Sequence, residues 1–180
     1  MWHSSSSFGR ALAEAVLGAV VFAAVLVGSQ TAQSQTLPAT PENLKPPAGE
    51  RLLAHAHAVG QQIYICDGSK WLLSRPDAQL FDEAGQKVGS HFAGPTWQWS
   101  DGSQVTGKPI ASATPNPDSI PWLLLTATGH TGDGVMKNVS SIQRLHTRSG
   151  KPPASGCGAP HSGEQARISY KADYYFYVSR

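Results

Sequence analysis

Apolar and polar residues alternate in the C-terminal segment ISYKADYYFYV, which spans residues 168–178. Successive side chains of a β-strand point to opposite faces of a sheet, so this alternation predicts a strand with one buried face. The segment LLAHAHAV, residues 52–59, alternates in the same way and predicts another strand, although its alanines are also compatible with a helix. The shared faces carry Ile168, Tyr170, Ala172, Tyr174, Phe176 and Val178 in the first segment, and Leu53, His55, His57 and Val59 in the second.

Turn residues between apolar segments predict three β-hairpins. Asp67-Gly68 and Asp101-Gly102 each separate two apolar arms, and Asp-Gly supplies the positive φ angles of a tight two-residue turn. Gly85 marks the loop of a third hairpin within AQLFDEAGQKVG. With two-residue loops, the expected cross-strand pairs are Tyr64 with Trp71 in the first hairpin and Trp99 with Gln104 in the second.

Three further segments complete the pattern. The apolar run IPWLLLTAT, residues 120–128, is bounded by turn residues and predicts a central strand buried on both faces. In VMKNVSSIQRLHT, residues 135–147, apolar residues spaced by three predict either a helical turn or a bulged strand. Residues 148–164 form a Gly- and Pro-rich loop. We therefore predict an all-β fold with minor helical turns, an antiparallel sandwich or barrel of meandering hairpins.

The N-terminal pattern differs from the rest of the chain. Arg10 precedes AVLGAVVFAAVLV, residues 15–27, an apolar run shorter than the roughly 18 residues that a membrane span needs. We interpret residues 1–32 as a signal peptide, with an uncleaved membrane anchor as the alternative. Residues 33–49 are interpreted as a Pro-rich linker, and residues 50–180 as a single β-rich domain. The expected location is secreted or periplasmic, with no stable membrane span after cleavage.

Cleavage of this signal peptide is a testable expectation. The apolar run ends at Val27 and small residues follow it, so we expect the mature protein to start between Gln30 and Gln33. Mass spectrometry of the exported protein measures this start directly. A full-length mass that retains Met1 would contradict the prediction.

The chain has two cysteines, Cys66 and Cys157. In an oxidising compartment such a pair is most simply a disulfide, and we predict one between them, with two free thiols as the alternative. The bond would connect the early strands to the late ones.

The charged residues exclude one class of partner. The net charge is +2, from 14 Lys and Arg against 12 Asp and Glu, and no basic run occurs. A nucleic-acid-binding protein concentrates positive charge on one surface, so we expect no nucleic-acid partner.

Several motifs together resemble a known family. They are GQQIYICDG, HFAGPTWQWSDGS, IPWLLLTAT, SIQRLHTRSGKPP followed by Cys157, and the closing YKADYYFY. The family is a group of secreted bacterial and fungal proteins catalogued as a domain of unknown function, number three thousand four hundred and fifty-five, and the likeness runs from about Pro47 to Val178. The resemblance implies an exported, mostly β domain and supplies no catalytic residue. Some fungal members carry a malate dehydrogenase label, but this chain lacks the G-x-G-x-x-G turn and the βαβ pattern of a dinucleotide-binding enzyme.

The candidate metal ligands are His55 and His57. In a strand, an H-x-H pair places both rings on the same side, close enough to share an ion. A third ligand is expected from His91, His130 or Asp133. Seven histidines in the chain also allow such a pair to arise by chance.

The segment HFAGPTWQWSDGSQV carries the candidate ligand-binding residues. A strand places Trp97 and Trp99 on the same face, where two indoles form either a stacking platform for a sugar or part of a core. We predict that Trp97 is buried in the core and that Trp99, beside the turn, is a ligand contact. His91 and Asp101 are its expected polar partners.

No motif specifies an enzyme. The chain has no G-x-S-x-G nucleophile elbow, and its carboxylates show no spacing that singles out a glycosidase pair. We therefore expect a binding or surface-associated module for carbohydrate or another cell-envelope component, without an organic cofactor. The alternative is a hydrolase or metal-dependent enzyme that uses His55, His57 and His91.

Overall fold

The structure is a computed structural model that describes residues 38–180. The predicted signal peptide, residues 1–32, and the first part of the predicted linker lie outside the described residues. Within residues 38–180, no helix has the length and apolar character needed to cross a membrane.

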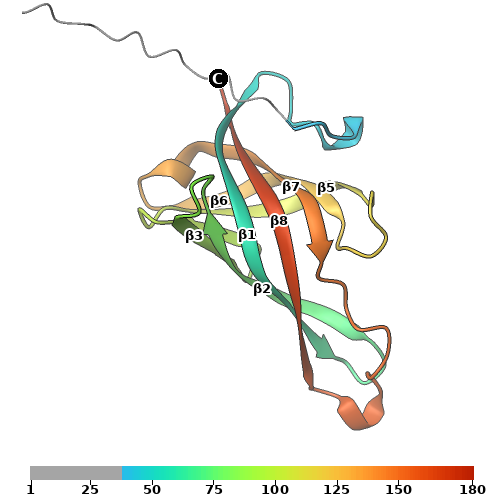
Figure 1. The fold of residues 1–180 in the computed structure, drawn as a ribbon. Coiled ribbons are helices and arrows are strands. Elements are labelled where there is room, and N and C mark those ends of the chain that lie inside the picture. The colour runs from blue at the N-terminus through green and yellow to red at the C-terminus, as the bar shows by residue number, and fades with distance from the viewer. Residues whose placement is uncertain (1–37) are drawn as a thin grey trace, which may run out of the picture. The chain divides into compact units, whose positions relative to one another are not determined.

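The described residues form a closed antiparallel β-barrel in which the strands pair in chain order and β8 pairs with β1 (Figure 1). The all-β prediction with minor helical turns is confirmed, and of the two predicted architectures the barrel is the one observed. The elements are η1 (Glu42–Leu44), β1 (Glu50–Cys66), β2 (Trp71–Phe81), β3 (Lys87–Phe92), β4 (Thr96–Trp99), β5 (Gln104–Ala113), β6 (Trp122–Thr131), η2 (Val135–Asn138), β7 (Val139–Ser149), η3 (Ala159–His161) and β8 (Gln165–Ser179).

Strands β1 and β8 lie side by side along the barrel and supply much of its core (Figure 1). Small residues of β1 stand opposite aromatic residues of β8: Ala54 pairs with Phe176, and Ala56 pairs with Tyr174. The alanines leave the space that the rings fill, which explains why an Ala-rich segment forms a strand here and not a helix. The alternation predicted for 168–178 is confirmed, because its apolar face points into the barrel.

The first hairpin differs from its predicted register. Tyr64 pairs with Leu73, not with Trp71, and the loop between β1 and β2 has four residues. The side chain of Asp67 explains the longer loop, because its Oδ1 accepts hydrogen bonds from the backbone N–H groups of Ser69 and Lys70. These bonds favour a wider turn than the two-residue type I′ loop that Asp-Gly alone suggests.

The strand register of the second hairpin differs by one residue from the predicted register. Gln98, not Trp99, stands opposite Gln104. A hydrogen bond from Trp99 N–H to the Ser103 carbonyl closes a turn with three residues between them, and Gly102 adopts a φ of 86°. A three-residue hairpin ends with a residue in the left-handed conformation, which glycine supplies without strain.

The remaining segments follow the sequence with local differences. Gly85 lies in the β2–β3 loop as predicted, and the segment 135–147 contains both a helical turn, η2, and the bulged strand β7. The apolar run 120–128 contributes to β6, which begins at Trp122 and is buried on both faces only around Leu124 and Leu125.

Part of the segment assigned to the linker packs on the barrel. Leu44 in η1 is fully buried against Leu124 and Leu145, on the outer face of the sheet. The side-chain amide of Gln143 donates to the Leu44 carbonyl at 2.5 Å. A single leucine in a polar, Pro-rich segment gives no hydrophobic periodicity, so its packing against the sheet could not be predicted from the sequence pattern.

The predicted disulfide between Cys66 and Cys157 is present, with the two α-carbons 5.4 Å apart. It joins the β1–β2 hairpin to the β7–β8 loop, and both lie at the same end of the barrel in Figure 1. Backbone hydrogen bonds between Cys66 and the residues Gly163 and Glu164 support the same junction.

Candidate functional site

Side chains that can bind a ligand or a metal ion gather in two places in the structure. The first is a cavity of about 210 Å³ inside the barrel, which we call the barrel pocket. Its lining residues are Gln62, Leu73, Ser74, Arg75, Pro76, His91, Gly94, Pro95, Trp97, Pro109, Leu123, Leu125, Arg144 and Tyr174. The second, the histidine cluster, consists of His55, His57, Glu83, Asp173 and His146.

His91 lies in the wall of the barrel pocket and is buried. Its ring stacks on Trp97, with centroids 4.4 Å apart, and its Nδ1 lies 2.9 Å from the Thr96 carbonyl oxygen. Burial lowers the pKa of His91 to about 3, so the ring is neutral at physiological pH. A carbonyl oxygen can only accept, so Nδ1 carries the proton and Nε2 keeps its lone pair.

Three buried polar atoms of the residues that line the pocket have no hydrogen-bond partner within residues 38–180. They are Gln62 Nε2, Trp97 Nε1 and the Tyr174 hydroxyl oxygen. Their residues are at most 2% exposed. Leaving a buried polar group without a partner costs about 1–3 kcal/mol, so the buried polar groups of a folded protein are satisfied by protein atoms, ordered water or a ligand.

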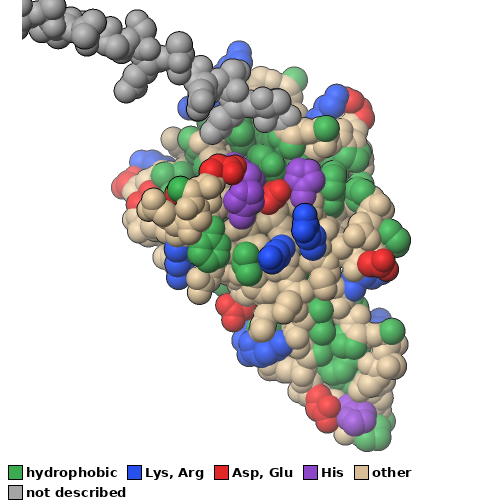
Figure 2. Space-filling model, in the orientation of Figure 1, with side chains coloured by type: hydrophobic (Ala, Val, Ile, Leu, Met, Phe, Trp, Pro, Cys, Tyr) green, Lys and Arg blue, Asp and Glu red, His purple; other side chains and the backbone are tan. Residues whose placement is uncertain are grey.

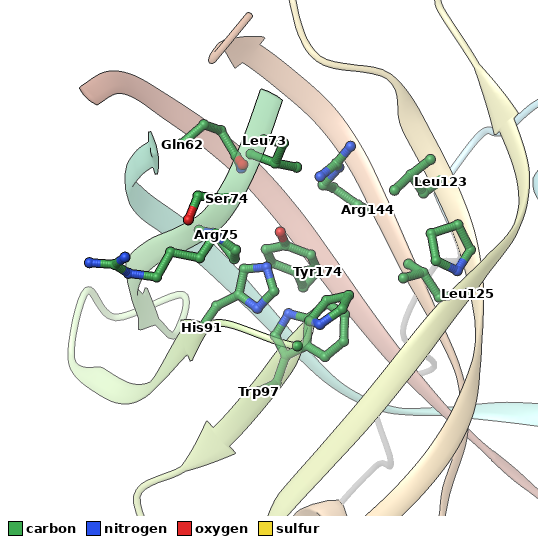
Figure 3. Close-up of a pocket in the computed structure, with 14 residues that line it drawn as sticks. Gln62, Leu73, Ser74, Arg75, His91, Trp97, Leu123, Leu125, Arg144 and Tyr174 are labelled. Carbon is green, nitrogen blue, oxygen red and sulfur yellow. The ribbon is translucent and has the colours of Figure 1, made fainter. Parts of the chain in front are cut away.

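The charge of the pocket is positive. Arg144 follows the core residue Ile142 by two positions on β7, so its side chain shares the interior face, opposite Tyr174 on β8 (Figure 3). Its Nε and Nη2 donate to the Pro121 carbonyl at 3.1 and 2.9 Å, which holds the guanidinium in place. Arg75 also borders the pocket, but its guanidinium points away from it in Figure 3. Among the described residues, no Asp or Glu lines this pocket.

The histidine cluster lies outside the barrel and results from strand register. His55 and His57 alternate with the inward alanines of β1, and they pair across to Tyr175 and Asp173 of β8. Glu83 follows the end of β2 in the β2–β3 loop, and this places it beside the same face of β1. Histidine and acidic side chains gather over β1 and β8, with basic side chains close by (Figure 2).

One carboxylate bridges the two rings of the H-x-H pair. His55 Nδ1 lies 2.7 Å from Glu83 Oε1, and His57 Nε2 lies 3.3 Å from Glu83 Oε2. The two imidazole centroids are 4.7 Å apart, and Tyr175 stacks on the His55 ring at 4.2 Å. The other ring nitrogen of His55, Nε2, is buried without a partner among the described residues. The stacking fixes the orientation of His55, whereas Glu83 is exposed and can adjust.

A second carboxylate holds His57 from the opposite side. Asp173 Oδ1 lies 2.7 Å from His57 Nδ1, and Asp173 Oδ2 lies 2.8 Å from His146 Nδ1. His146 sits in the β7 bulge with a φ of 48°, a left-handed conformation that non-glycine residues adopt at a cost. The bulge therefore turns His146 toward Asp173.

These contacts shift the protonation of the cluster. Burial acts to lower the pKa of His57, but the hydrogen bonds to Asp173 and Glu83 outweigh it and raise this pKa above its usual value. The hydrogen bonds from His57 and His55 in turn lower the pKa of Glu83. Without another ligand, the cluster thus favours a protonated His57 between two carboxylates.

The predicted ligand-binding residues do not meet in one place. Trp97 is buried in the core, and Trp99 is half-buried on the same face, where it contacts Phe176. Trp99 lines a separate shallow hollow, whereas His91 lines the barrel pocket. Asp101 has a structural role, because its carboxylate accepts from the backbone N–H groups of Ser103 and Val135 and holds η2 against the turn.

The predicted third metal ligands also lie elsewhere. His130 Nε2 contacts the Val139 carbonyl, Asp133 pairs with Lys137, and His91 lies inside the barrel. His55, His57 and His91 therefore do not form one site. The sequence reasoning missed Glu83, Asp173 and His146, and neither the hydrophobic pattern nor the spacing of these residues marks them.

The comparisons with known proteins give a family and no activity. The model of a family described as a protein of unknown function, DUF3455, matches residues 47–178. No curated protein and no solved structure matches the chain. The matched range includes all eight strands of the barrel except the last residue of β8, both cysteines and every residue of the two candidate sites. The chain therefore belongs to the DUF3455 family.

Proposed function

We propose that this protein is a binding module whose barrel pocket takes a small acidic carbohydrate or a comparable acidic component of the cell envelope. The observation that carries the proposal is the set of three buried, unpartnered polar atoms on residues lining the pocket. The amide nitrogen of Gln62 and the indole N–H of Trp97 can only donate, and the Tyr174 hydroxyl can also donate. A ligand rich in acceptor oxygens would satisfy all three.

The charge of the pocket supports an acidic ligand. Arg144 lines it without a carboxylate partner among the described residues, and a carboxylate is the group that a guanidinium binds best. Burial also raises the pKa of the Tyr174 phenol, which keeps its hydroxyl protonated as a donor.

The size and shape of the pocket support a ligand of about one sugar ring. Its volume, about 210 Å³, lies below the roughly 300–1,000 Å³ of pockets that hold drug-sized molecules. His91 already covers one face of the Trp97 indole, so the ligand would contact the polar edge of the indole and not stack on that face. The disulfide supports an oxidising, exported location, where envelope sugars are available.

The experiment compares a uronic acid with its neutral hexose in calorimetric titrations of the protein. We expect the uronic acid to bind the wild-type protein and the neutral sugar to bind more weakly. Arg144→Gln should weaken uronic acid binding at least about tenfold, because a hydrogen bond to a charged group contributes about 1.5–3 kcal/mol.

The matched control is Arg148→Gln. Arg148 is an exposed arginine of the same strand that does not line the barrel pocket, so its replacement should leave the affinity unchanged. Equal binding of both sugars, or equal losses in the two variants, would contradict the proposal. Thermal melts of both variants establish that the barrel is intact.

A further inference from the structure

We propose that His55, His57 and Glu83 form a binding site for a divalent transition-metal ion, of which zinc is the representative, on the outer surface of the barrel. This site is separate from the barrel pocket and does not depend on the function proposed for it. One ligand atom from each of the three residues lies within 4.8 Å of the other two. Ligands around a bound zinc ion are closer together than this, so only a small inward movement is needed.

The three ligands combine rigid and adjustable parts. His55 and His57 come from one long strand that pairs on both sides, with β2 and with β8. The stacking of Tyr175 restrains the His55 ring further. Glu83 lies in the β2–β3 loop with an exposed side chain, so it can close on an ion without disturbing the barrel.

The surroundings of His57 are those of a metal ligand. Metal-binding histidines usually donate their second ring N–H to a carboxylate, which fixes the tautomer and the ring orientation. Asp173 is in position to accept from His57 Nδ1 at 2.7 Å, so once a metal ion displaces the Nε2 proton, the Nε2 lone pair is directed toward Glu83 and His55. His146 holds the other oxygen of Asp173 from a left-handed backbone conformation, so the bulge that carries it also positions the supporting carboxylate.

The donor set selects the class of ion. Two imidazoles and one carboxylate suit zinc and copper, whereas calcium and magnesium prefer sites made of oxygen atoms. Three protein ligands leave a fourth tetrahedral position open, and the exposure of His57 and Glu83 gives solvent access to it.

The test is calorimetric titration of the metal-free, tag-free mature protein with zinc, and of its variants. We expect one zinc ion per chain. The double variant His55→Ala/His57→Ala should lose this binding. The matched control is His161→Ala, because His161 also pairs with an exposed carboxylate, Glu164, but lies outside the cluster. The His161→Ala variant should bind zinc with the affinity of the wild type.

Asp173→Asn tests the supporting role of the Asp173 carboxylate without changing a proposed metal ligand. This substitution preserves the shape of the side chain and removes its charge, and it should weaken zinc binding about 10- to 100-fold, as loss of a supporting carboxylate does. Cobalt substituted for zinc should show the visible absorption of a tetrahedral ion in the wild type, with an altered spectrum in Asp173→Asn.

The proposal is overturned if the wild type binds no stoichiometric zinc, or if the double variant and Asp173→Asn bind as the wild type does. Circular dichroism shows whether each variant is folded.

Discussion

Replacing Cys66 and Cys157 by serine is expected to lower the free energy of unfolding by about 4–5 kcal/mol. The bond links residues 91 positions apart, and a cross-link of this length removes a large amount of conformational entropy from the unfolded chain. For a domain of this size the loss corresponds to a melting temperature lower by roughly 10 °C or more, which differential scanning calorimetry measures.

Two controls separate the effect of the bond from that of the new side chains. Cys66 is buried, so a serine there adds a polar group to an apolar site, whereas alanine does not. The Cys66→Ala/Cys157→Ala variant and the chemically reduced wild type should therefore show the loss due to the bond alone. If both retain the melting temperature of the oxidised protein, the disulfide contributes nothing to stability and the prediction fails.

Replacing Trp97 by alanine is expected to destabilise the protein by about 3–5 kcal/mol. The indole is 1% exposed and contacts the rings of His91, Tyr174 and Phe176. The chain makes room for this indole at Gly107 of β5, where an added Cβ would lie 3.2 Å from the Trp97 ring. A cavity of this size cannot close by small movements, and urea denaturation measures its cost.

Trp99→Ala provides the matched comparison, since it removes an indole from the same strand and the same face. Trp99 is half-buried beside the turn and contacts Phe176, so its loss should cost less than about 2 kcal/mol. Equal destabilisation by the two substitutions would show that the whole segment is core. If neither variant is destabilised, Trp97 does not support the core as the structure implies.

Local pattern was sufficient to predict the fold class. The alternation in residues 168–178 predicted β8 and its inward face, because a strand exposes successive side chains on opposite sides. The two cysteines predicted the disulfide from chemistry alone. Hairpin register was not predictable at the same level, since Asp67 forms hydrogen bonds within its turn that lengthen the loop and move Tyr64 opposite Leu73.

The candidate sites were predictable only in part. His91 and the H-x-H pair were selected from residue type and spacing. The predicted neighbours of His91, however, were wrong. Closure of the barrel puts His91 inside, with its ring in edge contact with Tyr174, while His55 and His57 lie outside. A strand pattern shows which residues share a face of their own strand, and it cannot show which side of a closed sheet that face becomes.

The sequence by itself determined an all-β chain, its disulfide, its inward aromatic face and a histidine pair on one side of a strand. Only the tertiary structure decided which residues those histidines meet. Glu83 and Asp173 are 26 and 116 residues away from His57 along the chain, and His146 reaches Asp173 through a bulge. The physical reason is that such contacts depend on the register of several paired strands, and each register is set by turn hydrogen bonds and core packing summed over the whole barrel.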